Sequence, residues 1–279
     1  MQRYPGLISR DMKDLYASIL EPNKFDQFLT EVLFSPNQNV ASNKELQGLT
    51  NLPTNAPGTV IKLDVDYAKL QLDRMHSRID TKAVQVVLAY FNRIFRQISR
   101  GIFVQQSGVD AIKKLIAANE RVILLPVYKS FADFPVLLYT LFVNRIEIPF
   151  TFGNLEDIPK APLIKSLLTR LGYILTRRSR SQSLQTSYTT QALFAELLDK
   201  YRIVMMFKND LRIRSGKYNQ PTHPDIAIQW LLQSYLVRMQ KEGKNVHIVP
   251  ISVQYERLFE LRNIASEMVS GDIPRQTLP

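Results

Sequence analysis

Apolar and polar residues follow two different spacings in the two parts of this chain. Between Val60 and Arg100 the apolar positions recur at helical spacing, which predicts one or two helices. Asp11–Leu20 and Lys24–Leu33 are shorter amphipathic helix candidates, followed by a polar stretch rich in Asn, Gln, Pro and Thr. We therefore expect an N-terminal helical region over residues 1–100, with a linker near residues 37–58.

From residue 101 onward, short apolar runs rich in β-branched residues alternate with helical stretches. The runs predicted as strands are Arg121–Leu125, Ile146–Phe152, Gly172–Thr176, Ile203–Phe207 and Val246–Val253. The stretches predicted as helices are Phe134–Val143, Ala161–Leu171, Thr189–Lys200 and Asp225–Lys241. This alternation is typical of an α/β fold. We expect residues 101–279 to form an α/β domain, a mixed sheet covered by helices.

Composition narrows the class of protein. A chain of 279 residues that is 45% hydrophobic can bury a full core. It has no cysteine, which excludes disulfides, thiolate metal sites and a cysteine nucleophile. The longest uncharged apolar run, Phe134–Val143, is about half of the roughly 20 residues that span a bilayer, so we predict no transmembrane helix. This run fits either a helix at a membrane surface or a helix buried against the sheet.

The net charge of +11 indicates anionic partners. Most of the excess lies between Lys160 and Lys217, close to predicted strand ends, where pockets form. A basic helix, a zinc site, or aromatic residues interleaved with basic ones would favour nucleic acid, and none is evident. We therefore predict phosphorylated metabolites or anionic lipid headgroups as ligands, and no nucleic acid.

A strand, loop and helix at residues 124–134 carry the strongest functional signal. The loop places Tyr128 five residues before Asp133, on one surface, a geometry that suits a base and its orienting carboxylate. Taken alone, the pair also fits two ordinary loop residues. The frame resembles the first motif of the glycerol-phosphate and dihydroxyacetone-phosphate acyltransferases, in which four residues separate a histidine from the aspartate that follows it. Tyr128 stands at the position of that histidine.

Three further segments resemble motifs of the same family, in the same order. Gly172–Arg178 is similar to the second motif, which implies that Arg177 or its neighbour contacts the substrate phosphate. Phe207–Lys217 is similar to the third motif, and Ile248–Glu260 to the fourth.

The third motif is only partly retained. Arg212 is present, but Asn209 replaces the family glutamate and Asp210 replaces the following glycine. The resemblance implies a phosphate site formed by Arg177, Arg212, Asn209 and Lys217, although a lysine in such a loop is most often merely solvated.

The resemblance covers about residues 90–260, and the segment before the first motif favours the dihydroxyacetone-phosphate branch. It implies an acyltransferase-like α/β domain that uses acyl-CoA as co-substrate, a phosphorylated three-carbon acceptor, and no metal or cofactor. It also implies glycerolipid or ether-lipid synthesis, in the peroxisome or alternatively the mitochondrion, peripheral to a membrane. Family members usually continue beyond the point where this chain stops without a Ser-Lys-Leu-like ending. We expect either a lost targeting signal or a truncated C-terminus.

The two replaced residues predict impaired catalysis. A phenol with a pKa near 10 holds its proton at neutral pH, so Tyr128 cannot repeat the work of a histidine base. We interpret the chain as a pseudoenzyme of this family that retains the fold. One alternative is an active acyltransferase with an unusual base, for which His223 is a better candidate than His76 or His247. Another is a non-catalytic scaffold or subunit of a complex, with a protein partner.

Overall fold

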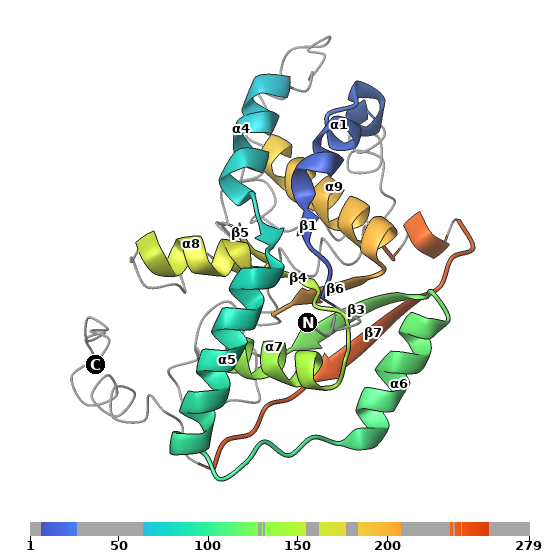
Figure 1. The fold of residues 1–279 in the computed structure, drawn as a ribbon. Helices are drawn as coiled ribbons and strands as arrows, with labels where there is room; N and C mark the ends of the chain where they lie inside the picture. Colours follow the sequence, from blue (N-terminus) through green and yellow to red (C-terminus); the bar gives the residue numbers. More distant parts are fainter. Residues whose placement is uncertain are drawn as a thin grey trace, which may run out of the picture.

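A five-stranded sheet forms the centre of the protein in a computed structural model (Figure 1). The structure describes residues 7–26, 64–127, 130, 132–154, 162–176, 184–207, 235–236, 238–240 and 242–256. The strands are β3 (Arg121–Pro126), β4 (Phe150–Asn154), β5 (Tyr173–Thr176), β6 (Ile203–Met206) and β7 (Val246–Ile251). Their order across the sheet is β5-β4-β6-β3-β7.

The α/β class is confirmed, but the described strands of this sheet all pair in parallel and do not form the mixed sheet we expected. A helix lies between each pair of successive strands from β3 to β6: α7 (Asp133–Val143), α8 (Pro162–Arg170) and α9 (Leu184–Tyr201). Each helix carries the chain back to the edge where it began, so the next strand starts on the same side.

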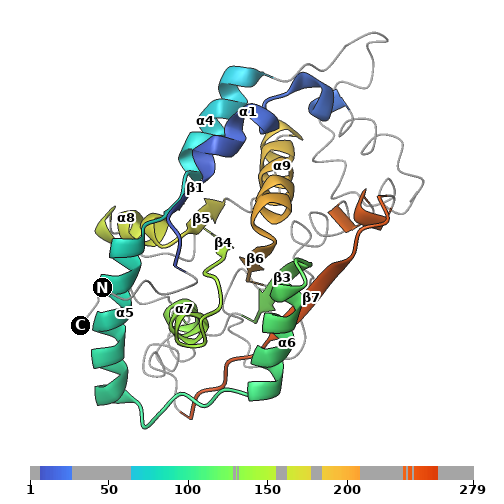
Figure 2. The same ribbon diagram turned by 45° about the vertical axis from the view of Figure 1, so that its right-hand side comes forward.

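Two groups of helices cover the sheet. The remaining helices are α1 (Tyr16–Ile19), which follows the 3-10 helix η1 (Met12–Leu15), and α4 (Val65–Met75), α5 (Thr81–Ile98) and α6 (Gln106–Ala117). Helix α9 packs with α1 and α4, whereas α5 packs with α7 and α8. Figures 1 and 2 show these two groups on opposite sides of the sheet.

Helix α7 belongs to the core. Five of its apolar side chains are buried: Phe134, Val136, Leu137, Leu138 and Leu141. Strand β3 beside it is equally apolar, with Val122, Ile123 and Leu124 fully buried. The interpretation of Phe134–Val143 as a buried helix is therefore confirmed, and its alternative as a membrane-surface helix is wrong.

The N-terminal helices join the same core. Strand β1 (Arg10–Asp11) pairs in an antiparallel manner with β2 (Arg78–Ile79), and Ile79 bridges to Leu171 just before β5. The predicted helical region from 60 to 100 is two helices, α4 and α5, separated by β2. Aspartate side chains cap both: Asp64 accepts from Tyr67 N–H, and Asp80 from two N–H groups of α5. The linker near residues 37–58 lies outside the described residues, and the boundary at residue 100 stays a prediction.

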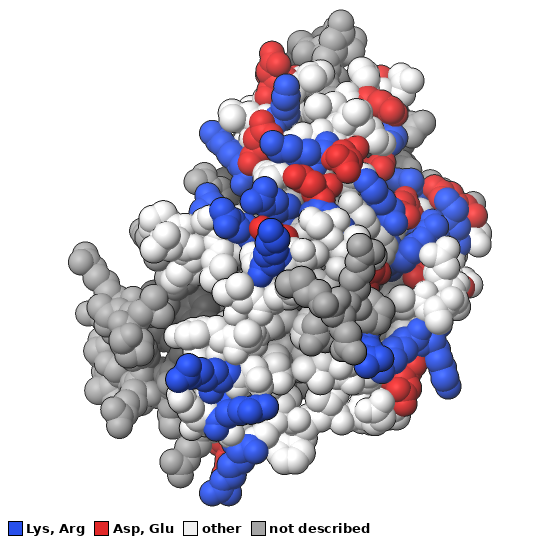
Figure 3. Space-filling view, in the orientation of Figure 1, with Lys and Arg blue, Asp and Glu red and all other residues white. Residues whose placement is uncertain are grey.

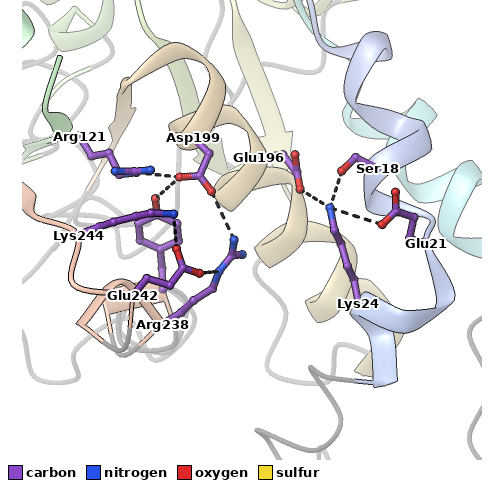
Figure 4. Close-up of polar contacts among 10 residues, drawn as sticks. Ser18, Glu21, Lys24, Arg121, Glu196, Asp199, Arg238, Glu242 and Lys244 are labelled. Carbon is purple, nitrogen blue, oxygen red and sulfur yellow. Dashed lines mark hydrogen bonds and ion pairs between the residues drawn. The ribbon is translucent and has the colours of Figure 1, made fainter.

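A cluster of charged groups fixes the amino edge of the sheet (Figure 4). Asp199, near the end of α9, accepts hydrogen bonds from Arg121 Nε at 2.8 Å and from the Tyr235 hydroxyl at 3.2 Å. Arg238 lies 3.5 Å from the same carboxylate and also pairs with Glu242 at 2.9 Å. Burial, with the neighbouring Asp199, raises the pKa of Tyr235 well above its usual range. The cluster joins the first residue of β3, the end of α9 and the chain just before β7.

Candidate functional site

The predicted motifs follow the carboxyl ends of strands that share one edge of the sheet. Strand β3 ends at Pro126, two residues before Tyr128, and β5 ends at Thr176, directly before Arg177. Strand β6 ends at Met206, and the fourth motif begins within β7. In open parallel sheets, ligands bind outside the carboxyl ends of the strands. The described strand ends that precede the first three motifs, and the end of β7 within the fourth, therefore share the edge where a ligand site is expected.

Asp133 is the best-defined side chain at this edge. It is the first residue of α7 and is 0% exposed. Its Oδ2 accepts a hydrogen bond from the Ser130 backbone N–H at 2.9 Å, and its own N–H donates to Ser130 O at 3.0 Å. Its Oδ1 accepts from the Tyr255 hydroxyl at 2.5 Å. A buried carboxylate needs such donors, because desolvation without them is costly.

Tyr255 connects the first motif to the fourth. Strands β3 and β7 are hydrogen-bonded neighbours, and beyond their ends Val127 N–H donates to Ile251 O at 3.0 Å. Tyr255 follows four residues after Ile251 and reaches back to Asp133. The sequence placed Tyr255 inside the fourth motif but did not single it out as a site residue. The sequence signal that could have found it is its position two residues after the predicted strand Val246–Val253.

The contacts of Asp133 orient its carboxylate in a chosen direction. The loop after β3 donates to one oxygen and the segment after β7 donates to the other. The carboxylate therefore cannot rotate without losing a buried hydrogen bond. A carboxylate fixed in this way can position a neighbouring proton-carrying group or stabilise positive charge on it. Tyr128, the residue predicted to stand beside it, lies outside the described residues.

The other predicted site residues, Arg177, Asn209, Arg212 and Lys217, also lie outside the described residues, and their roles stay predictions. The residues before them are well anchored. Thr176 is buried at the end of β5 and donates its hydroxyl to Gly153 O at 3.1 Å. Phe207, the first residue of the third motif, is 3% exposed.

The glycine of the second motif has a structural reason. Gly172 has a φ of +83°, which strongly favours glycine. A Cβ at this position would approach Ile79 Cγ1 to 2.8 Å, closer than real Cβ contacts. Gly172 therefore lets β2 pack tightly against the start of β5, away from the carboxyl edge.

Two of the three histidines lie away from the candidate site. His76 caps the end of α4, where its Nε2 is 2.9 Å from Asp11 Oδ1. His247 is paired with Val122 near the start of β3 and β7, 3.7 Å from Glu120. Both positions are at the amino edge, whereas Asp133 follows the carboxyl end of β3. His223 lies outside the described residues.

Within the described ranges, no group of histidine and acidic side chains is arranged to hold a metal ion. Among the same residues, none of the helices combines the length and hydropathy needed to cross a membrane.

Fold and site together define an α/β protein with an oriented, buried carboxylate at the carboxyl edge of a parallel sheet. The sequence is 24% identical over 207 residues to dihydroxyacetone phosphate acyltransferase of Oryctolagus cuniculus, a match that covers 74% of this chain and 30% of that protein. It is 28% identical over 246 residues to glycerol-3-phosphate acyltransferase of Pseudomonas fluorescens strain SBW25, covering 84% of this chain and 28% of that protein. The chain is therefore a relative of the dihydroxyacetone-phosphate and glycerol-3-phosphate acyltransferases.

The matches have two limits. No family model matches the sequence. In the P. fluorescens strain Pf0-1, the identity to glycerol-3-phosphate acyltransferase is 30% over 196 residues, and the match covers 70% of this chain but only 22% of that protein. The matched segment thus spans less than a third of each of these relatives. Because both branches match, the choice of the dihydroxyacetone-phosphate branch stays a prediction.

Proposed function

We propose that this chain is an acyltransferase-like domain that binds acyl-CoA and a phosphorylated three-carbon acceptor at the carboxyl edge of its sheet, with strongly impaired acyl transfer. The proposal is carried by Asp133. This carboxylate is fully buried and held by donors from two separate motifs, Ser130 and Tyr255. A catalytic pair requires a carboxylate oriented in this way. The orientation of Asp133 supports our proposal that the chain retains the surroundings of the catalytic histidine although tyrosine stands in its place.

The impairment follows from the chemistry of acyl transfer. The acceptor hydroxyl attacks the thioester carbonyl, a carbon–oxygen bond forms, and the carbon–sulfur bond breaks to release CoA. A base takes the hydroxyl proton, which is then available to the departing thiolate. Tyr128 is a poor base at neutral pH because its reference pKa is near 10, and losing the base costs about 10²- to 10⁴-fold in rate.

Acceptor binding is expected to be weakened as well. Arg177 and Arg212 supply charge for a phosphate, with Lys217 as a further candidate. Asn209 does not replace the charge of the family glutamate, and Asp210 brings a negative charge toward an anionic ligand. Dihydroxyacetone phosphate and glycerol 3-phosphate are both candidate acceptors, and acyl-CoA is the only other molecule that the reaction needs.

The setting that we propose is glycerolipid or ether-lipid synthesis at the peroxisome, with the mitochondrion as the alternative, and with peripheral association to a membrane. An active enzyme with an unusual base is the second candidate. The places of His76 and His247 at the amino edge disfavour them for that role. His223 is the histidine left for it.

Acyl transfer from palmitoyl-CoA to each acceptor tests the proposal. We expect the natural chain to be nearly silent and the Tyr128→His, Asn209→Glu double variant to gain at least about 100-fold. The matched control adds Asp133→Asn to the double variant and should lose that gain, because the new histidine then lacks its orienting carboxylate. Turnover by the natural chain that His223→Ala abolishes would instead identify an active enzyme. Silence of every variant, together with no binding of acyl-CoA, would favour a scaffold.

A further inference from the structure

Helix α5 and the connection that follows it present a surface with unusual composition. From Thr81 to Val109 the chain contains four cationic residues and no acidic one: Lys82, Arg93, Arg96 and Arg100. All four are exposed. In Figure 3, basic side chains are spaced over the lower part of the molecule, where α5 lies in Figure 1, and are separated mainly by uncharged ones.

Large apolar side chains stand among these cations. Val86 is 70% exposed, Tyr90 is 65% exposed, and Ile98 is also exposed. Val86, Tyr90 and Arg93 are spaced by four and three residues, which puts them on one face of α5. The opposite face is buried, with Val84, Val87, Leu88 and Phe95 in the core. The exposed side chains are therefore the outward face of a helix that is already packed.

Phe103 is the most prominent residue of this surface. Its side chain is 94% exposed, and Val104 beside it is also exposed. Hydrogen bonds between the Ser99 hydroxyl and both backbone groups of Gly101 shape the turn before it, at 3.0 and 3.3 Å. A phenylalanine held outward at the end of a basic helix combines an apolar anchor with positive charge.

We propose that this surface docks on an anionic phospholipid bilayer. It consists of four cations and five apolar residues: Lys82, Arg93, Arg96, Arg100, Val86, Tyr90, Ile98, Phe103 and Val104. Cations on an interfacial helix are attracted by anionic headgroups, while apolar side chains enter the boundary with the acyl chains. A protein partner with an acidic groove would satisfy the charges, but a bilayer also receives apolar side chains spread along a convex helix and loop. The charge complementarity and the outward Phe103 favour the lipid surface.

The surface lies near the edge that carries the candidate site. In both ribbon views, the segment after β7, which includes Tyr255, runs toward the connection between α5 and α6 (Figures 1 and 2). Docking through this surface would bring the carboxyl edge of the sheet close to the membrane. The inference rests on the peripheral membrane association proposed above and names the surface for it. It does not rest on acyl transfer, since it concerns a different set of residues and a different ligand.

Helix α4 offers a matched control within the same chain. It also exposes apolar residues, Val65 and Leu70, and two cations, Lys69 and Arg74. In α4, however, Asp66 and Asp73 offset the cations, so an anionic surface gains little from it.

Sedimentation of the full chain with sucrose-loaded vesicles tests the inference. We expect binding to vesicles of phosphatidylcholine mixed with phosphatidylglycerol, weak binding to pure phosphatidylcholine, and loss of binding in high salt. The Arg93→Gln, Arg96→Gln, Arg100→Gln variant should bind about 100-fold more weakly, since each cation near an anionic surface contributes about fivefold. Phe103→Ser should weaken binding about tenfold.

The control variant Lys69→Gln, Leu70→Ser should bind like the natural chain, and circular dichroism should show that all variants remain folded. Absence of binding to the anionic vesicles would overturn the inference, as would equal losses in the α4 and α5 variants. A Phe103→Ser variant that turns a dimer into a monomer on gel filtration, without vesicle binding by either form, would assign the surface to a second copy instead. Each of these results is independent of whether any acyl transfer is detected.

Discussion

The two edges of the central sheet each hold an aspartate, in different ways. At the amino edge, Asp199 is partly exposed and meets two guanidinium groups, Arg121 and Arg238. At the carboxyl edge, Asp133 is fully buried, and the backbone N–H of Ser130 and the phenol of Tyr255 donate to it. The first carboxylate has its charge neutralised by cations. Ser130 and Tyr255 are neutral donors, and their hydrogen bonds orient the second carboxylate.

This difference separates a structural site from one suited to chemistry. The amino-edge pairs tie β3, α9 and the chain before β7 together, and ion pairs of this kind contribute modest net stability. An oriented buried carboxylate contributes a directed negative potential to whatever lies next to it, as a catalytic pair requires. The strand ends that lead into the predicted motifs lie at the second edge, and the described histidines lie at the first. Changing one carboxylate at a time tests this difference between the two edges.

The largest effect is expected for Asp133→Ala. The change leaves the Ser130 N–H and the Tyr255 hydroxyl without the acceptor that each uses inside the protein. An unsatisfied buried donor costs about 1–3 kcal/mol, so we expect the free energy of unfolding to fall by about 2–4 kcal/mol. Urea denaturation followed by circular dichroism measures it.

The shape-conserving Asp133→Asn variant should lose less, because its amide oxygen still accepts one hydrogen bond. Tyr255→Phe supplies the second side of a double-mutant cycle with Asp133→Asn. A coupling free energy of about 1–2 kcal/mol is expected for a hydrogen bond to a charged group. Additive losses in the two single variants would show that the short contact between Tyr255 and Asp133 has no energetic role.

The sequence predicted the α/β fold well because apolar runs and amphipathic stretches alternate along the chain. It misplaced β4, which begins at Phe150 and not at Ile146, although Ile146 and Ile148 are both buried. Burial produces the same apolar signal in a loop as in a strand, and Pro149, without an N–H, separates the two. The parallel pairing was also missed, since strand direction depends on how the crossovers pack.

Asp133 is the one predicted site residue that lies within the described part of the chain, and its contacts were not predicted. Asp133 was predicted because its loop resembles the first motif of the acyltransferase family. Its partner Tyr255 is 122 positions away in the sequence, and only the adjacency of β3 and β7 brings them together. Strand order is a property of the whole sheet, so a linear pattern could not reveal it.

A smaller effect is expected at the amino edge for Asp199→Asn. The variant keeps an oxygen for Arg121 and Tyr235 but removes the charge that pairs with both arginines. We expect a loss of about 1–2 kcal/mol in urea denaturation, because the carboxylate is mostly shielded from solvent. Glu196→Gln is the matched control on the same helix, where Glu196 pairs at 2.7 Å with the more exposed cation Lys24 (Figure 4). It should cost less than about 1 kcal/mol, and a larger loss than that of Asp199→Asn would reverse the assignment of the amino-edge cluster as the tie between α9 and β3.

The smallest effect concerns Glu242 at the rim of the same cluster. Hydrogen bonds from Lys244 and Arg238 hold its pKa below the ordinary value of 4.5. A carboxyl group with a lowered folded-state pKa adds stability above its ordinary pKa, and that stability is lost as the pH falls through the folded-state value. Because Glu242 is largely solvated, natural protein and Glu242→Gln should differ by only a few tenths of a kcal/mol at neutral pH, and less in high salt. Urea denaturation of both proteins at neutral pH and near pH 3–4 should show that difference shrinking on acidification. A difference that grew instead would mean that the protonated form of Glu242, and not its ion pairs, is favoured by the fold.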